Sequence, residues 1–269
     1  MKRILDYGSA EFRGIEREEL LETILRAEGR TVLCEVFCPA SPLVDGISNE
    51  QLVAAFGADL VLLNMFAGDG LANLKSHLGR PVGVNVEPSD KVPEYRRASR
   101  DNLRRIQEAD FVVVTANPDT EVGTEKVISA VELTREMLPG AAVFAGKMHG
   151  SGGRGLVESA EIARMARVAD VVLIPAPGTV PGSRESVVAE LVDAAHAEEA
   201  LAVMAVGTSQ EGADADTVST LALASKRVGG DILHLGDAGV SGITDPMNIL
   251  AASVAIRGRR HTYRRMAMR

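Results

Sequence analysis

The amino-acid sequence predicts a (β/α)8 barrel, or TIM barrel, formed by residues 1–269 as a single domain. Eight short apolar runs recur along the chain, with starts separated by roughly 20 to 32 residues, the length of a βα unit. Patterns of helical period lie between the runs, and strands that alternate with helices pair in parallel through right-handed crossovers. A doubly wound sheet is the alternative, but it more often has fewer strands.

The apolar runs are expected to form the strands because they are short and bounded by glycine, proline or polar residues. In chain order they are TVLCEVFC (31–38), LVLLNM (60–65), PVGVNVEP (81–88), FVVVTAN (111–117), AVFAGKMH (142–149), VVLIPAP (171–177), LAVMAVGT (201–208) and ILHLGDA (232–238). A further helical segment, EREELLETILRAEG (16–29), precedes the first strand and is expected to cover the barrel floor.

Helix start signals support several of the intervening helices. Ser48 precedes NEQLVAAFG, and Ser183 opens a segment of helical period. Asp245 is the expected N-cap of the helix after the eighth strand, with Pro246 at its first position.

The stretch DADTV (214–218) resembles the nucleophile loop of haloacid dehalogenase-like phosphatases. In those enzymes the aspartate directly follows a hydrophobic strand, whereas here GTSQEGA separates Asp214 from the seventh apolar run. The residues that follow have helical period, so Asp214 or Asp216 is the expected N-cap of the seventh helix. We therefore do not assign Asp214 as a nucleophile.

Composition limits the classes of partner. The net charge of −8 argues against a general nucleic-acid binder, and no apolar run approaches the ~20 residues of a membrane span. Cys34 and Cys38 lie on one face of the first strand, too far apart for a disulfide. With no signal-peptide-like apolar segment at the N-terminus, we expect a cytoplasmic protein.

The C-terminal tail, RGRRHTYRRMAMR (257–269), carries six arginines. A solvated tail or a contact between subunits is the favoured interpretation, and an anion-binding role is the alternative. We expect a homo-oligomer.

Strand parity predicts polar side chains inside the barrel. Glu35 alternates with apolar residues that face the helices, where a charge would be buried without a partner, so it is expected to point inward. The same reasoning is applied to the other strands. The polar residues expected inside or at the strand ends are Glu35, Asn64, Asn85, Glu87, Thr115, Asn117, Lys147, His149, His234 and Asp237. Most lie towards C-terminal strand ends, where such barrels have their active sites.

Loops after the last three strands are the expected site for an anion. Glycines there let backbone N–H groups approach a phosphate or carboxylate, and hydroxyl groups add donors. The residues expected to bind the anion are Gly178, Thr179, Gly207, Thr208, Ser209, Gln210, Gly236 and Gly239, together with Asn85 and Asn117. The alternative is that the glycines serve only tight turns.

Lys147 stands within a strand, where low-dielectric surroundings would make it a Schiff-base nucleophile or a general base. The alternative is a charged anchor paired to Glu87 or Glu35. His149 would carry protons or bind a metal, and His234 would contact a substrate hydroxyl group.

Three carboxylates are the main metal candidates. Glu35, Glu87 and Asp237 would hold Mg²⁺ or Mn²⁺ through oxygen ligands, although no metal-binding motif of tight spacing is present.

Several segments together resemble those of an uncharacterised bacterial family. They are VEP (86–88), AGKMHG (145–150), PAPGTVPG (175–182), GTSQEGADADT (207–217), HLGDAG (234–239) and IRGRRHTYRRMA (256–267). Members of that family resemble phosphate-binding TIM barrels and commonly carry the automatic label of haloacid dehalogenase-like hydrolase. The resemblance covers nearly the whole chain and implies the barrel fold without implying an established reaction.

The leading functional hypothesis is a lyase, aldolase-like, or an isomerase acting on a small phosphorylated or carboxylated metabolite. Lys147 would be nucleophile or base, and Glu87 and His149 would move protons. A Mg-dependent hydrolase or phosphoenolpyruvate-mutase-like enzyme is the first alternative. A non-enzymatic metabolite-binding barrel is the second, because a fold does not imply an activity.

Overall fold

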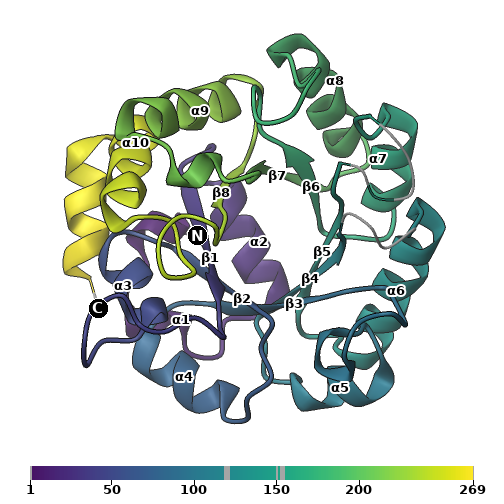
Figure 1. Ribbon diagram of the computed structural model, residues 1–269, viewed down its shortest axis with the longest axis horizontal. Coiled ribbons are helices and arrows are strands. Elements are labelled where there is room, and N and C mark those ends of the chain that lie inside the picture. Colours follow the sequence, from purple (N-terminus) through teal and green to yellow (C-terminus); the bar gives the residue numbers. More distant parts are fainter. Residues whose placement is uncertain (1, 118–121, 150, 152–154, 269) are drawn as a thin grey trace.

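The computed structural model describes residues 2–117, 122–149, 151 and 155–268, which form a closed barrel of eight parallel strands in sequence order (Figure 1). The predicted TIM-barrel fold is confirmed. The strands are β1 (Thr31–Phe37), β2 (Leu60–Asn64), β3 (Val82–Val86), β4 (Phe111–Ala116), β5 (Ala142–Lys147), β6 (Val171–Pro175), β7 (Leu201–Val206) and β8 (Ile232–Leu235). Each pairs with its neighbours in sequence, and β8 pairs with β1.

One α-helix follows each strand and covers the outside of the barrel. These helices are α3 (Asn49–Ala55), α4 (Leu71–Leu78), α5 (Arg100–Arg105), α6 (Thr124–Met137), α7 (Ser159–Ala166), α8 (Glu185–His196), α9 (Ala215–Arg227) and α10 (Pro246–Ala267). Short 3-10 turns precede two of them, η2 (Glu94–Arg96) before α5 and η3 (Gln210–Gly212) before α9.

Most of the predicted helix starts are confirmed. Ser48 accepts a hydrogen bond from the Gln51 N–H, and Asp245 accepts one from the Met247 N–H. The start of α8 is different, since its N-cap is Arg184. Ser183 is instead used in the preceding loop, where its hydroxyl oxygen accepts from the Gly178 and Val180 N–H groups.

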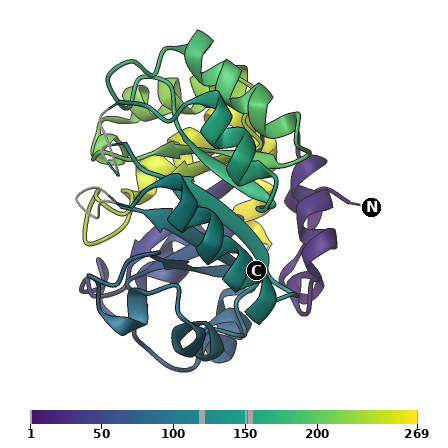
Figure 2. The same cartoon turned by 90° about the vertical axis from the view of Figure 1, so that its right-hand side faces the viewer.

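The N-terminal segment closes the bottom of the barrel, as expected. It consists of η1 (Ile4–Asp6), α1 (Ser9–Phe12) and α2 (Arg17–Leu25), which lie at the end of the barrel opposite the loops that follow the strands (Figure 2). Ile4, Leu20 and Ile24 are fully buried there against inward-facing strand residues. Burial of apolar surface at ~25 cal/mol per Å² makes this floor part of the folded core rather than an appendage.

Two stacked phenylalanine rings fill the lower barrel. The ring centroids of Phe111 and Phe144 are 5.0 Å apart, and both side chains are fully buried. Gly83 on β3 makes room for them, because a Cβ atom at that position would stand 2.2 Å from the Phe111 ring. The lower barrel is therefore a packed core, and open space is left only towards the C-terminal strand ends.

Four aspartates occupy equivalent positions around the bottom of the barrel. Each immediately precedes an even-numbered strand and accepts a hydrogen bond from a backbone N–H at the start of the strand before it, at 2.8 Å in every case. The pairs are Asp59 with Val32, Asp110 with Val82, Asp170 with Val143 and Asp231 with Ala202. This repetition divides the barrel into four similar β-α-β-α quarters.

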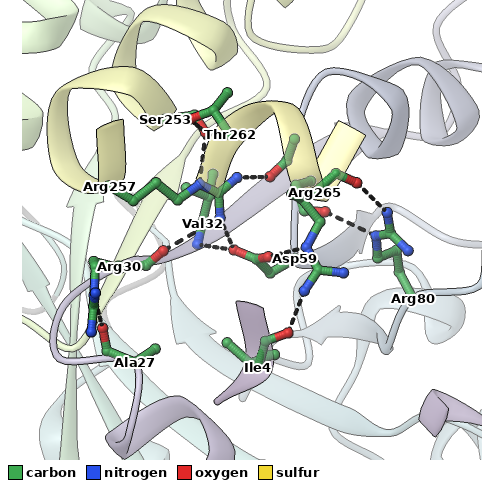
Figure 3. A network of polar contacts seen from close by, with 12 residues as sticks. Ile4, Ala27, Arg30, Val32, Asp59, Arg80, Ser253, Arg257, Thr262 and Arg265 are labelled. Carbon is green, nitrogen blue, oxygen red and sulfur yellow. Dashed lines mark hydrogen bonds and ion pairs between the residues drawn. The ribbon is translucent and has the colours of Figure 1, made fainter. Parts of the chain in front are cut away.

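The Arg-rich tail is not a solvated extension, which corrects that part of the favoured interpretation, whereas a contact between subunits stays a prediction. It continues α10 beyond a kink at Gly258, and two of its arginines enclose Asp59, whose side chain is fully buried (Figure 3). Arg257 Nη1 lies 2.6 Å from Asp59 Oδ2, and Arg265 Nε lies 2.7 Å from Asp59 Oδ1. Arg265 also donates to backbone oxygens of the N-terminal segment, so it ties the two ends of the chain together.

The described part of the chain has no disulfide, since both cysteines are free thiols, as expected from their spacing. No helix there combines the length and apolar character that crossing a membrane requires.

Candidate active site

Polar side chains from β1, β2 and β8 meet at one side of the barrel mouth. Nε2 of His234 lies 3.1 Å from Oε2 of Glu35, and Asn64 donates from Nδ2 to Oδ2 of Asp237 at 2.8 Å. His234 is buried, whereas the other three side chains are half-buried and open to the mouth. The predicted inward orientation of Glu35, Asn64 and His234 is confirmed, and we call these three residues with Asp237 the polar cluster.

The polar cluster holds a carboxyl group that titrates close to neutral pH. Burial and the nearby charge of Glu35 raise the pKa of Asp237 to about 6, with a further contribution from Glu211. Burial alone would lower the pKa of His234, but its hydrogen bond to Glu35 and the charges of Glu211 and Asp237 raise it above the ordinary value. A histidine whose protonated form is favoured by Glu35 therefore lies beside a protonatable acid.

Glu211 is the residue of this region that the sequence patterns did not reveal. It lies in η3, is only 2% exposed, and accepts a hydrogen bond from the Ala238 N–H through Oε1 at 3.1 Å. Gly236 packs directly against it, since a Cβ there would be 2.4 Å from Oε1. In the sequence, its position inside a glycine-rich loop was the one sign that it lies near the barrel mouth.

The opposite side of the mouth is an apolar pocket. Inward residues of β5, β6 and β7 line it, namely Gly146, Leu173 and Ala205. Lys147, His149, Thr179, Gly207 and Thr208 stand around this pocket, so five predicted residues share one cavity. The mouth thus has a charged side and an apolar side.

The predicted inward orientation of Lys147 is corrected. The inward residues of β5 are Ala142, Phe144 and Gly146, and Lys147 belongs to the other parity. Its ammonium group pairs with Oε1 of Glu161 on α7 at 2.9 Å rather than with Glu87 or Glu35. Glu161 also accepts from the Thr124 hydroxyl group, and although burial opposes this, the two contacts lower its pKa.

Glu87 does not join the polar cluster. It is 1% exposed, and its Oε1 accepts from Nε of Arg96 at 2.8 Å in an ion pair made within its own loop. Asn85 is likewise occupied, since it accepts from the Thr115 hydroxyl group at 2.7 Å. Asn117 follows β4 and is half-buried.

The predicted metal set of Glu35, Glu87 and Asp237 is therefore not assembled. The ion pair with Arg96 neutralises Glu87, and the remaining two carboxylates are accompanied by Asn64 and His234. Within the described ranges, no three acidic, histidine or cysteine side chains are grouped closely enough to hold a metal ion.

The anion-binding loops are only partly as expected. Gly236 and Gly239 serve close packing, because Cβ atoms there would meet Glu211 and the Ile243 carbonyl oxygen. The Gly178 N–H donates to Ser183, and the Thr179 hydroxyl donates to the Ala176 carbonyl, so both are engaged within the β6 loop.

The β7 loop remains open to solvent. Thr208 and Ser209 are exposed and have positive φ angles of 58° and 67°, which are uncommon for residues other than glycine. The Thr208 hydroxyl donates to the Thr179 carbonyl at 2.9 Å, and the Gln210 amide, oriented as a donor, reaches the same oxygen at 3.2 Å. Sparsely populated backbone angles persist where the surroundings impose them, often at ligand sites.

Asp214 is confirmed as an N-cap. Its carboxylate accepts from the Thr217 N–H at 2.9 Å at the start of α9, and it is exposed outside the barrel mouth. The haloacid dehalogenase-like reading of DADTV finds no support in this geometry.

Comparison with solved structures finds barrels of the same fold at low sequence identity. A Schiff-base-forming fructose-1,6-bisphosphate aldolase matches with a TM-score of 0.58 and 14% identity, covering 87% of this chain and 98% of that one. Deoxyribose phosphate aldolase from Aeropyrum pernix matches with 0.53 and 16%, covering 84% and 95%. Thiamine phosphate pyrophosphorylase from Pyrococcus furiosus matches with 0.53 and 12%, covering 86% and 99%. These likenesses establish the fold alone.

Sequence comparison gives the family. No curated protein matches the chain. One family model, described as a domain of unknown function (DUF7916), matches residues 5–269. The match spans nearly the whole barrel, from the floor segment to the arginine-anchored tail, and the chain belongs to the DUF7916 family.

Proposed function

We propose that the chain is a lyase or isomerase that transfers a proton at a carbon next to a carbonyl or carboxylate group of a small anionic metabolite. The observation that carries the proposal is Asp237, a half-buried carboxyl group at the end of β8 whose pKa is raised to about 6. A general base is most effective when its pKa lies near the working pH, because it is then both ionised and basic. An aspartate of ordinary pKa would be a weaker base for this step.

The neighbours of Asp237 provide the other groups that such a reaction requires. His234, held by Glu35 through Nε2, leaves Nδ1 without a hydrogen-bond partner in the described structure. As an imidazolium, it would donate from Nδ1 to the substrate oxygen on which negative charge develops. Asn64 holds the Asp237 carboxyl group in a fixed orientation through its side-chain amide.

Lyase and isomerase chemistry share this proton transfer. In an isomerase, Asp237 would remove the proton from the carbon next to the carbonyl group and return it to the adjacent carbon. In an aldol-type lyase, it would accept the proton of the hydroxyl group as the carbon–carbon bond breaks to give an aldehyde and an enolate, and would then give that proton to the enolate carbon. The aldolases with similar barrels are described as acting on phosphorylated sugars, which supports a phosphorylated substrate. The exposed residues Thr208 and Ser209 of the β7 loop are the proposed contacts for the anionic end, and the Thr208 hydroxyl would have to leave the Thr179 carbonyl oxygen to donate to it.

The role of Lys147 is narrower in this proposal than the sequence suggested. A Schiff base would require Lys147 to leave Glu161 and turn from the outward to the inward side of β5. We propose that Lys147 fixes the junction of β5 and α7, and that His149 contributes to the apolar pocket. The free thiols of Cys34 and Cys38 support a reducing, cytoplasmic location.

Proton exchange tests the proposal without knowledge of the substrate. Phosphorylated and carboxylated carbonyl compounds would be incubated with the protein in D2O, and deuterium incorporation would be followed by NMR. We expect incorporation into at least one compound, with Asp237→Asn reducing the rate by about 10²–10⁴-fold and Lys147→Met leaving it within a few-fold. Borohydride trapping at Lys147, or full activity of Asp237→Asn, would contradict the assignment.

A further inference from the structure

Glu211 occupies the position where the sequence predicts a bound anion. The loop after β8 presents a backbone N–H at Ala238, and Oε1 of Glu211 accepts it at 3.1 Å. Gly236, expected to let a phosphate approach, instead packs against the same carboxylate. An anionic ligand at this point would have to displace a side chain that is 98% buried, and it would meet like charge.

The backbone of the η3 turn that carries Glu211 is held by a side chain of α10. Asn248, near the start of α10, donates from its side-chain amide to the backbone oxygens of Glu211 at 3.1 Å and Ala213 at 2.7 Å. These contacts fix η3 to α10, so the backbone at Glu211 has a defined position beside the mouth.

The negative charge at this side of the mouth is compensated only in part. In the described ranges, no lysine or arginine lies within ion-pair distance of Glu211, Asp237 or Glu35, and the Glu35 charge is balanced by His234 alone. Oε2 of Glu211 is buried and has no hydrogen-bond partner there. A buried carboxylate oxygen without a partner costs free energy unless a ligand or water supplies a donor.

We propose that Glu211 is a specificity-determining residue, and that the substrate carries an amino group that binds as an ammonium ion between Glu211 and Asp237. This inference rests on the proposed function and names its substrate class: an anionic metabolite that also bears an amine. An ammonium group supplies several N–H donors and one positive charge. It thereby satisfies the unpaired oxygen and offsets the charge excess, while a phosphate would be rejected at this end.

The probes are three small compounds of similar size: ethanolamine, ethylene glycol and glycolate, which are cationic, neutral and anionic. Binding to the full-length protein would be measured by NMR from the shifts of the Asp237 carboxyl and His234 ring resonances. We expect ethanolamine to bind at least tenfold more tightly than glycolate at pH 7.5. Bound ethanolamine should also lower the pKa of Asp237, since a nearby positive charge favours the ionised form.

The groups that face Asp237 predict the pH dependence of this binding. They are Glu35 on β1, Asn64 on β2, His234 on β8 and Glu211 on η3. As pH rises through about 6, Asp237 ionises and ethanolamine affinity should increase. Glycolate affinity should fall over the same range.

Glu211→Gln is the decisive variant because the glutamine oxygen can still accept the Ala238 N–H. It should weaken ethanolamine about tenfold or more and strengthen inorganic phosphate. Asp216→Asn, an exposed acid at the start of α9, is the matched control and should change neither. If Glu211→Gln fails to fold, Asp237→Asn should weaken ethanolamine to a similar extent.

Three results would overturn the inference: glycolate binding more tightly than ethanolamine, ethanolamine leaving both resonances unmoved, or saturation of the site by millimolar Mg²⁺ in place of the amine. These outcomes are separate from the proposed function. Deuterium exchange without amine binding would refute the amine and leave the proton transfer standing. Amine binding without deuterium exchange in any compound would refute the proton transfer and leave the amine site standing.

Discussion

Buried carboxylates lie at both ends of this barrel, but they are paired with arginines at the bottom and not at the mouth. At the bottom, Asp59 is fully buried between Arg257 and Arg265 and also accepts a backbone N–H. At the mouth, neither Asp237 nor Glu211 pairs with a lysine or arginine within the described structure, and His234 offsets only part of the charge there. The paired charge holds the chain together, and the unpaired charges give the mouth its chemistry.

The difference appears in the groups themselves. At the mouth, burial and neighbouring carboxylates raise the pKa of Asp237 to about 6. At the bottom, the guanidinium groups outnumber the carboxylate, so their mutual repulsion lowers the pKa of an arginine. Arg80 donates to the backbone oxygen of Arg265, and burial together with the charge of Arg265 lowers the pKa of Arg80 to about 10. Buried charge that lacks a partner costs free energy, and strongly shifted pKa values cluster at functional sites, which is why we place function at the mouth.

Removing Asp59 should have the largest effect on stability. Asp59→Ala leaves two buried guanidinium groups without a carboxylate to balance their charge, and we expect a loss of about 3–5 kcal/mol in the free energy of unfolding. Asp231 occupies the equivalent position in the last quarter, but its partner His196 is 40% exposed. Asp231→Ala should therefore cost less, about 1–2 kcal/mol. Urea unfolding of both variants measures the difference in the free energy of unfolding. Equal losses would show that the two buried arginines do not make Asp59 more important to stability than Asp231.

Replacing Asp237 should change stability in a pH-dependent way. Because its folded pKa is about 6 and its ordinary value is 3.8, the folded protein binds the proton more tightly. The wild type should thus lose stability as pH rises from about 4 to about 6, by about 1–2 kcal/mol after allowance for solvent screening. Asp237→Asn lacks this loss, so its stability relative to wild type should be higher at pH 7.5 than at pH 4.

Urea unfolding at the two pH values, with Asp216→Asn as control, measures this double difference. A difference that vanishes, or one of opposite sign, would show that the Asp237 carboxyl group is compensated after all.

The smallest expected effect concerns the cap of α9. Asp214→Ala removes the acceptor for the Thr217 N–H and should cost about 1 kcal/mol, as loss of an N-cap does. Deuterium exchange activity should be unchanged, since Asp214 is exposed outside the mouth. A large loss of activity with intact stability would show that Asp214 takes part in catalysis, against our assignment.

The parts of the site that sequence could predict are those where one strand face is plainly apolar. In β1 and β8, Val32 and Leu233 mark the helix-facing side, so Glu35 and His234 had to point inward. In β5, both parities consist of apolar or small residues up to Lys147, so alternation did not decide which side the lysine takes.

Long-range contacts account for what was missed. The partner of Lys147 is Glu161 on the following helix, and the burial of Glu211 depends on Gly236 and Asn248, which are distant in sequence. The four aspartates of the barrel bottom did leave a signal. A small residue and an aspartate precede each even-numbered strand, as in Ala58-Asp59, and comparing the runs with one another would have revealed the repeat.

No lysine or arginine pairs with the carboxylates of the mouth within the described structure, and the pKa of Asp237 is the property that depends most directly on this. It would be measured by NMR titration of the labelled carboxyl carbon in the wild-type protein and in Glu35→Gln. We expect a pKa of about 6 in the wild type and a lower value in the variant, because Glu35 contributes to the shift. An Asp237 pKa in the ordinary range near 3.8, unchanged by Glu35→Gln, would contradict it.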